Sequence, residues 1–560
     1  MLSRFKNLNL LELGLVILVG MAFYAFHFGE YLESFSTDVF FFNDPDDAKV
    51  YYWNTWHFAH QLSEGVSPFY TDYICTPNGT GLWMHAYTIW FGLLNLILGD
   101  IELSINLGIA IQLIVAFVGF YYLAKRFVYR PYFAGVVACV SVFNTYILAK
   151  CGVHYNLVLI GVLPFLLIYM LKLFPVIKGR LSVDRKHILG FLALLIIGFL
   201  MEYYVVFYAM AFLAVYLLWF GWLEKWFDTW NWKKSMVLVG LFGVGHIILR
   251  LMRIGGLEEK GAVWGAADFR QLIKPSVNSE SGVQWYLENV PELPNDNKIF
   301  IGISMLIYLI VAIVFFFQDQ RKDKAARFFL FSSVLFLMVT LPVIRIAGVD
   351  LFYNFTAIVH YIPFVQNVRA PDRFILMFFV TAVLFICRVI FLETNETKGW
   401  NKYVAFTLAF GGLFLVEHKH QPMQAVEQPA AVEVLEPMRG KTVLMLPFGL
   451  RDGFQGLGDF DENQMMLQTR YGFKLPSGYL SRLGDETWDS FRSNALYSAL
   501  VNLQDGQVVE IDLKEELRVN GIDAVCVPVE YLYKHRKLDG LLRSTFQAST
   551  SVDSWTLYQL

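Results

Sequence analysis

Long apolar segments separated by short charged turns are the feature that most constrains the fold of this chain. The first segment covers residues 13–28, and similar segments recur as far as residues 403–416. A helix needs roughly 20 apolar residues to cross a bilayer, and 56% of the 560 residues are hydrophobic whereas 17% are charged. The sequence therefore predicts a polytopic α-helical membrane protein.

The apolar segments predict about eleven membrane spans. Residues 86–98 are too short to cross and are expected to form an interfacial or re-entrant helix. Residues 188–220 could form one overlong helix or two short spans broken near Met201-Glu-Tyr-Tyr204, and we expect two because they place Lys225, Lys233 and Lys234 inside. The expected spans are 13–28, 103–123, 132–148, 155–174, two within 188–220, 237–251, 299–317, 328–346, 374–392 and 403–416.

The basic residues predict which side each loop faces. Arg4 and Lys6 precede the first span, which lacks an Ala-x-Ala cleavage pattern, so we expect a retained anchor with a cytoplasmic N-terminus. Residues 29–85 contain Lys49 as their one basic residue against eight acids, which is typical of an outward-facing loop. An odd number of spans then places the C-terminus outside as well.

The chain changes character near His418. Residues 1–417 form the predicted transmembrane domain with its outer loop at 29–85, and residues 418–560 form a small α/β domain outside the membrane. In this domain we expect strands at 441–447 and 522–527, a helix at 513–519 and a hairpin at 549–560. The net charge of −3, without a basic tail, excludes nucleic acid as a partner.

Polar and aromatic side chains collect at the outer ends of the expected spans. The acids can supply a base, arginines can hold a phosphate with two hydrogen bonds, and aromatic rings can stack on sugars. Together they would suit transfer of a sugar from a lipid phosphate. The set consists of Asp44, Asp46, Asp47, Tyr52, Trp53, Trp56, His57, His154, Glu202, His360, Arg369, Asp372 and Arg373.

Several short motifs, taken in order along the chain, resemble the bacterial polytopic glycosyltransferases of the GT-C superfamily. The resemblance covers most of the chain, including the terminal domain. Its motifs are Asp44-Pro45, Tyr52-Trp53, Trp56, Pro68-Phe-Tyr-Thr71, Thr76-Pro-Asn-Gly79, Asn106, Gly152-Val-His154, Pro164, Arg369-Ala-Pro-Asp-Arg373, Gln468-Thr-Arg-Tyr471 and Gly478-Tyr-Leu-Ser-Arg482.

The resemblance implies a catalytic carboxylate in the first outer loop, a polyprenyl-phosphate sugar donor in a bacterial inner membrane and a periplasmic glycan, lipid or protein as acceptor. Asp44 matches the carboxylate, and Asp46 or Asp47 takes this role if the loop register is shifted. The transfer would invert the anomeric carbon. The additional Asp46-Asp47 pair leaves open a divalent cation such as Mg or Mn, because hard cations favour clustered oxygen ligands.

Other roles for these residues stay open at this level. Arg369 and Arg373 would bind the donor phosphate or anchor a helix end at lipid headgroups. Tyr52, Trp53, Trp56, His154, Glu202 and His360 would contact substrate, although tryptophans are also common in an interfacial aromatic belt and a lone histidine is often structural. A transporter or flippase of lipid-linked sugars, or a non-catalytic assembly subunit with the same fold, are the alternative functions.

Overall fold

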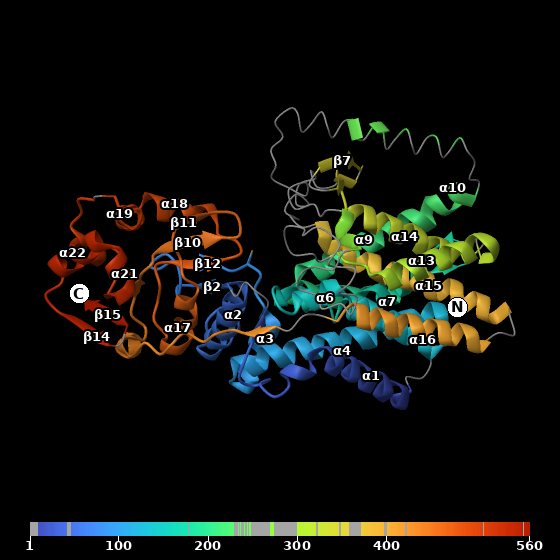
Figure 1. Cartoon of the computed structure of the whole chain (residues 1–560), viewed down its shortest axis with the longest axis horizontal. Coiled ribbons are helices and arrows are strands. Elements are labelled where there is room, and N and C mark those ends of the chain that lie inside the picture. The colour runs from blue at the N-terminus through green and yellow to red at the C-terminus, as the bar shows by residue number, and fades with distance from the viewer. Residues whose placement is uncertain are drawn as a thin grey trace. The chain divides into compact units, whose positions relative to one another are not determined.

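The computed structural model contains two compact units (Figure 1). One unit comprises Met1–Glu33, Ile109–Gly152 and Leu157–Pro422, and is called the helical unit below. The other comprises Ser34–Gly108, Val153–Asn156 and Met423–Leu560, and is called the mixed unit. The structure describes residues 9–41, 46–83, 85–177, 180–228, 269–273, 299–320, 323–346, 349–354, 356–357, 371–396, 400–419, 423–507, 509–552 and 554–560, with single residues between 233 and 247.

The helical unit has the apolar helices that the sequence predicts. Among the described residues, five stretches are long and apolar enough to cross a membrane: Leu10–Tyr31, Ile101–Val128, Pro131–Lys150, Tyr203–Trp226 and Pro371–Glu393. This confirms the membrane class, whereas the number of crossings stays a prediction, and the expected span at 237–251 lies largely outside the described residues.

The helices of the helical unit include α1 (Leu10–Phe28), α5 (Pro131–Val142), α6 (Thr145–Lys150), α7 (Leu163–Leu173), α8 (Ile188–Met201), α9 (Tyr203–Leu218), α13 (Ile303–Phe315), α14 (Lys324–Thr340), α15 (Ile375–Glu396) and α16 (Trp400–Glu417). The helix α4 (Ile101–Val128) begins in the mixed unit.

Three expected spans differ from the helices observed. Residues 132–148 divide into α5 and α6, because the side chain of Asn144 accepts a hydrogen bond from the Ile147 amide at 3.1 Å and so begins a new helix. In the span expected at 155–174, the helix starts only at α7. The span expected at 328–346 ends early, because α14 stops at Thr340 and β6 (Val343–Ile346) pairs antiparallel with β7 (Val349–Tyr353). The expected break within 188–220 is confirmed, with Glu202 between α8 and α9.

One ion pair fixes the start of α14 against α15. Asp323 caps α14 by accepting a hydrogen bond from the Ala326 amide at 2.8 Å, and its other oxygen lies 2.8 Å from a guanidinium nitrogen of Arg388. Arg388 also donates to the carbonyl oxygen of Phe127 at 2.5 Å. Because Arg388 is largely buried, this paired charge holds three segments of the helical unit together.

The mixed unit is built around two small sheets. One has the strand order β14-β15-β13-β9, with β13 (Ala524–Pro528) parallel to β9 (Val443–Met445) and antiparallel to β15 (Trp555–Gln559). The other has the order β11-β10-β12, from β10 (Gly449–Asp452), β11 (Gly456–Gly458) and β12 (Gly478–Leu480). The strands β9 and β13, the hairpin of β14 (Ser549–Val552) with β15, and the helix α20 (Leu513–Val519) occur where the sequence predicts strands, a hairpin and a helix, whereas the three strands of the second sheet were not predicted. The remaining helices are α2 (Asp46–Ser63), α3 (Ile89–Leu98), α17 (Asn463–Tyr471), α18 (Asp485–Ser493), α19 (Ala495–Gln504), α21 (Val529–Lys534) and α22 (Arg536–Thr545).

The division of the chain differs from the expected one, because much of the predicted outer loop belongs to the mixed unit. Residues 46–63 of that loop form α2, an 18-residue helix. Its side chains Val50, Trp53 and Phe58 share one buried hydrophobic cluster with residues of the C-terminal segment such as Leu444 and Val525. The core of the unit is therefore made from both ends of the chain.

Candidate functional site

The candidate site lies at the first turn of α2, directly after the residues that include Asp44. Asp44 itself lies outside the described residues, and the description of Asp46 is confined to its backbone at the start of the helix. Asp47 is the carboxylate of this group whose surroundings the structure gives.

Asp47 joins three distant parts of the mixed unit. Its Oδ1 accepts a hydrogen bond from the hydroxyl of Tyr479 at 2.9 Å, and its Oδ2 lies 3.3 Å from Nε2 of His154. The side chains of Asp47 and His154 are 32% and 26% exposed, so the pair is in contact with solvent. The structure thus brings together two residues that the sequence selects, Asp47 and His154, and adds Tyr479.

Tyr479 is held in β12 with its hydroxyl toward Asp47. The guanidinium of Arg451 lies 4.9 Å from the centre of the tyrosine ring, and Arg451 is 3.2 Å from the buried carboxylate of Glu462. Burial, followed by the charge of Asp47, raises the pKa of Tyr479 above its usual range. Tyr479 therefore stays protonated at neutral pH and acts as a hydrogen-bond donor to Asp47.

The short segment Val153–Asn156 positions His154 through its neighbours. Tyr51, in α2, donates a hydrogen bond to the side chain of Asn156 at 2.5 Å, and Tyr155 donates to the carbonyl oxygen of Phe40 at 2.6 Å. The rings of Tyr51 and Tyr155 lie 5.4 Å apart. One hydrogen bond and a ring contact thus hold the residues on the C-terminal side of His154 against α2, and a second hydrogen bond holds them against Phe40.

The aromatic residues expected to stack on sugars all have contacts within the protein. Trp53 is fully buried and donates through Nε1 to the side chain of Gln468 at 2.5 Å. Tyr52 donates to Glu102 at 2.9 Å, and Trp56 stacks on His60 with ring centres 5.0 Å apart. Trp53 in particular has no exposed surface for a ligand, which corrects the expectation for its ring.

Two histidines in the mixed unit are buried and neutral. His57 is stacked on Trp53 and forms a hydrogen bond between Nδ1 and the hydroxyl of Tyr87 at 2.8 Å. His85 lies 2.9 Å from Oδ1 of Asn54 and 2.7 Å from Oγ of Ser481. Burial lowers the pKa of both histidines to about 3. The sequence places His57 in the polar set, but these contacts make it part of the core.

The remaining predicted residues belong to the helical unit. Arg373 lies in the turn Pro371–Phe374, and its guanidinium is 4.5 Å from the ring centre of Tyr204. Glu202 is buried and caps α9 by accepting a hydrogen bond from the Tyr204 amide at 3.2 Å. Tyr204 therefore links the two predicted residues Glu202 and Arg373. His360 and Arg369 lie outside the described residues.

The described residues contain no cluster of side chains suited to a metal ion. Within them, no group of three or more histidine, cysteine, aspartate or glutamate side chains comes close enough to hold an ion. Asp47 uses both carboxylate oxygens on Tyr479 and His154. The described part of the site therefore provides a hydrogen-bonded carboxylate rather than a cluster of oxygen ligands.

Comparisons with known proteins identify no family for this chain, but they show a distant similarity to solved structures. No protein-family model and no curated protein sequence matches the chain. The chain is similar to the apo oligosaccharyltransferase of Archaeoglobus fulgidus, at 11% identity and a TM-score of 0.43, over 94% of this chain and 70% of that one. It is also similar to the same organism's oligosaccharyltransferase AglB in complex with an inhibitory peptide and a dolichol-phosphate, at 10% identity and a TM-score of 0.41, over 93% and 69% of the two chains.

A third similar structure is the Archaeoglobus fulgidus oligosaccharyltransferase in complex with Zn and sulfate, at 11% identity and a TM-score of 0.42, over 93% of this chain and 68% of that one.

The sequence alone does not reveal Tyr479, Tyr51 or Asn156 as part of the site. Tyr479 lies 432 residues from Asp47, and nothing in a single sequence pairs residues at that separation. The signal that was available is the motif Gly478-Tyr-Leu-Ser-Arg482, which belongs to the GT-C resemblance. For Tyr51 and Asn156 the sequence offers no comparable signal.

Proposed function

We propose that this membrane protein is a glycosyltransferase that moves a sugar from a polyprenyl-phosphate donor to an acceptor on the outer side of a bacterial inner membrane. The proposal rests on the contacts that Asp47 makes with His154 and Tyr479. Asp47 lies in the first turn of α2, three residues after Asp44. A hydrogen-bonded, partly exposed carboxylate is the kind of group around which proton transfer is organised.

In this proposal Asp44 is the general base. It takes the proton of an acceptor hydroxyl as that oxygen forms a bond to the anomeric carbon of the sugar. The bond from the anomeric carbon to the phosphate oxygen breaks on the opposite face, so the configuration inverts and the polyprenyl phosphate leaves. Asp47, held by Tyr479 and His154, positions the first turn of α2 and with it the preceding acid.

Arg373 and Arg369 are the proposed partners of the departing phosphate. Planar guanidinium groups form paired, charge-assisted hydrogen bonds with phosphate oxygens. Arg373 is already oriented by the ring of Tyr204, at 4.5 Å, and a cation fixed in this way loses little freedom on binding an anion. Charge on the leaving group is thereby stabilised as it develops.

The mechanism does not require a metal ion, because a carboxylate base and arginines supply the proton acceptor and the positive charge. Asp44, Asp46 and Asp47 would be the oxygen ligands if Mg or Mn were bound. Turnover in the presence of EDTA, with and without added Mg or Mn, distinguishes the two cases. We expect EDTA to leave turnover unchanged.

Turnover of a polyprenyl-phosphate sugar by purified variants tests the proposal. Asp44→Asn preserves size but removes the base, so we expect turnover to fall by roughly 100-fold or more with little change in donor binding. Asp46→Asn and Asp47→Asn should each cost far less, because neither removes the base and the amide oxygen introduced by Asp47→Asn can still accept the hydrogen bond from Tyr479. Arg373→Ala should weaken donor affinity, because a phosphate partner is lost.

Near-normal turnover by Asp44→Asn would contradict the catalytic assignment. If that variant also retained movement of lipid-linked sugar across proteoliposomes, the transporter function would be favoured. The comparison needs only one donor preparation, because all variants are measured against the same wild-type rate.

A further inference from the structure

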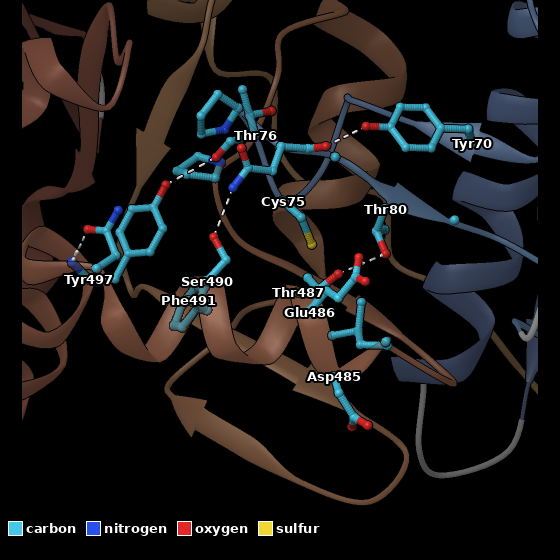
Figure 2. A pocket seen from close by; sticks show the side chains of 18 of the residues that line it. Tyr70, Cys75, Thr76, Thr80, Asp485, Glu486, Thr487, Ser490, Phe491 and Tyr497 are labelled. Atoms are coloured by element: carbon cyan, nitrogen blue, oxygen red, sulfur yellow. Dashed lines mark hydrogen bonds between the residues drawn. The ribbon is translucent and has the colours of Figure 1, made fainter.

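A second feature of the mixed unit is a cleft of about 1090 Å³ that the carboxylate site does not use (Figure 2). One wall is the loop of residues 75–81, and the other is the start of α18 with the residues just before it. Gly79 closes the loop with a φ of +64°, and a Cβ there would collide with the hydroxyl of Tyr70 and the carbonyl oxygen of Thr71. The loop is therefore held in one conformation that only glycine readily adopts.

Hydroxyl and amide side chains meet across the cleft. Nδ2 of Asn78 donates to Oγ of Ser490 at 2.8 Å, and the hydroxyls of Thr80 and Thr487 are 3.3 Å apart. Figure 2 shows Thr80 and Thr487 approaching each other from the two walls. Each of these groups can form more hydrogen bonds than the one it makes here. The lining can thus exchange hydrogen bonds with a ligand rich in hydroxyl groups.

Two exposed aromatic rings also line the cleft. Trp83 is 67% exposed and Tyr70 is 50% exposed, although large aromatic side chains normally bury most of their surface. Trp83 is held in place by stacking on Phe69, with ring centres 4.1 Å apart. A fixed, exposed ring is a flat apolar surface on which the C–H face of a sugar ring can pack.

Carboxylates complete the lining and set its charge. Asp485 and Glu486 are exposed in the first turn of α18. Carboxylates accept charge-assisted hydrogen bonds from hydroxyl groups, and they repel polyanions. Arg482 is the one cation among the described lining residues, against the two acids, and its guanidinium lies 3.6 Å over the ring of Phe454.

We propose that this cleft binds a neutral oligosaccharide, and that this oligosaccharide is the acceptor of the transfer proposed above, on which this second part rests. The volume of 1090 Å³ exceeds the roughly 1,000 Å³ at the upper end of pockets for drug-sized ligands, so several sugar units fit. A peptide bound by its side chains would need apolar subpockets. Here the aliphatic lining is limited to Pro77, Pro476 and Leu483.

The cleft and the carboxylate site share one short segment. Tyr479, which donates to Asp47, and Arg482, which lines the cleft, are three residues apart in the chain. An extended chain spans at most about 3.6 Å per residue, so their Cα atoms lie within about 11 Å. A chain of several sugars seated in the cleft can therefore extend to the first turn of α2.

Binding of glycans by the full-length purified protein tests the cleft without any transfer step. An array of neutral, N-acetylated and uronic-acid oligosaccharides is probed in the absence of donor, beside a lysine-rich peptide. We expect neutral glycans to be retained and uronic-acid glycans to be excluded. The paired change Asp485→Asn and Glu486→Gln should weaken neutral-glycan binding about tenfold, which corresponds to 1.4 kcal/mol, and Trp83→Ala should weaken it similarly.

Matched variants separate the cleft from general damage to the fold. Asp489→Asn changes an exposed acid of the same helix that does not line the cleft, and Tyr533→Ala removes a 62% exposed ring elsewhere in the unit. Both should bind glycans like the wild type. Asp44→Asn should retain glycan binding while losing transfer. Glycan binding thus tests the cleft, and transfer tests the proposed transferase function separately. Absence of glycan binding, equal binding by the cleft variants, or retention of the peptide alone would overturn the inference.

Discussion

His57 and His85 make the stability of the mixed unit depend on pH. Burial lowers the pKa of both to about 3, whereas the ordinary value is 6.5. Between these values the unfolded chain binds protons that the folded chain does not. The free energy of unfolding therefore falls as the pH drops through this range, by up to about 1.4 kcal/mol per pH unit for each histidine.

The measurement is thermal unfolding followed by tryptophan fluorescence at pH 7 and pH 5. We expect the wild type to lose stability on acidification and His57→Gln to lose less, because one of the two titrating groups is gone. His535→Gln, which changes a half-buried histidine of the same unit, is the control. An equal loss in His57→Gln and wild type would show that His57 does not contribute.

At the residue scale, the sequence identifies the kinds of groups in the site but not their pairing. Asp47 and His154 could be selected because they are ionisable residues at the ends of apolar segments. Their contact could not be predicted, because it depends on how the segment Val153–Asn156 folds onto α2. Trp53 was misassigned for the same reason: its indole is buried by a cluster assembled from distant segments.

The junction of α8 and α9 gives a prediction at the scale of elements. Glu202 satisfies the Tyr204 amide at the start of α9, and loss of an N-cap hydrogen bond typically costs about 1 kcal/mol. Glu202→Ala should therefore lower the thermal stability of the detergent-purified protein, and Glu202→Asp should recover most of it. If Glu202 also contacts substrate, as the sequence set suggests, Glu202→Asp would restore stability without restoring turnover.

The positions of helices and strands were predicted best where they depend on the residues of the element itself. The break at Glu202, the helix α20 and the hairpin of β14 and β15 follow from local apolar patterns and turn residues. The helix α2 was not predicted, because its segment lacks the continuous apolar character of a span. Part of its burial comes from the neighbouring helix α3, and part comes from α17, which lies some 400 residues later in the chain; Trp53 and Gln468 are 415 residues apart.

Membrane orientation is a prediction for the whole molecule. A reporter fused after Leu560 should be active only on the outer side, and one inserted between Asp319 and Lys324 only in the cytoplasm, because basic residues remain inside. Activity of the C-terminal fusion in the cytoplasm would require a different number of spans. It would also separate the proposed site from an acceptor on the outer side.

Truncation after Gln421 tests how the mixed unit is built. The shortened protein should still insert its helices, because each satisfies its own backbone hydrogen bonds. However, residues 46–83 should become sensitive to protease, because Val50, Trp53 and Ile74 lose the core residues supplied by the C-terminal segment. Resistance of residues 46–83 in the truncated protein would show that they fold without the segment Met423–Leu560.

The shared core of the mixed unit also determines when it can form during biosynthesis. Trp53 leaves the ribosome 415 residues before Gln468. At about 5–20 residues per second, translation takes roughly 20–80 s to supply that partner. Throughout this interval the part of α2 that packs on the C-terminal segment, Trp53 included, stays exposed without its partner. A ribosome that pauses between residues 109 and 422 would prolong this exposure without altering a single contact of the finished protein.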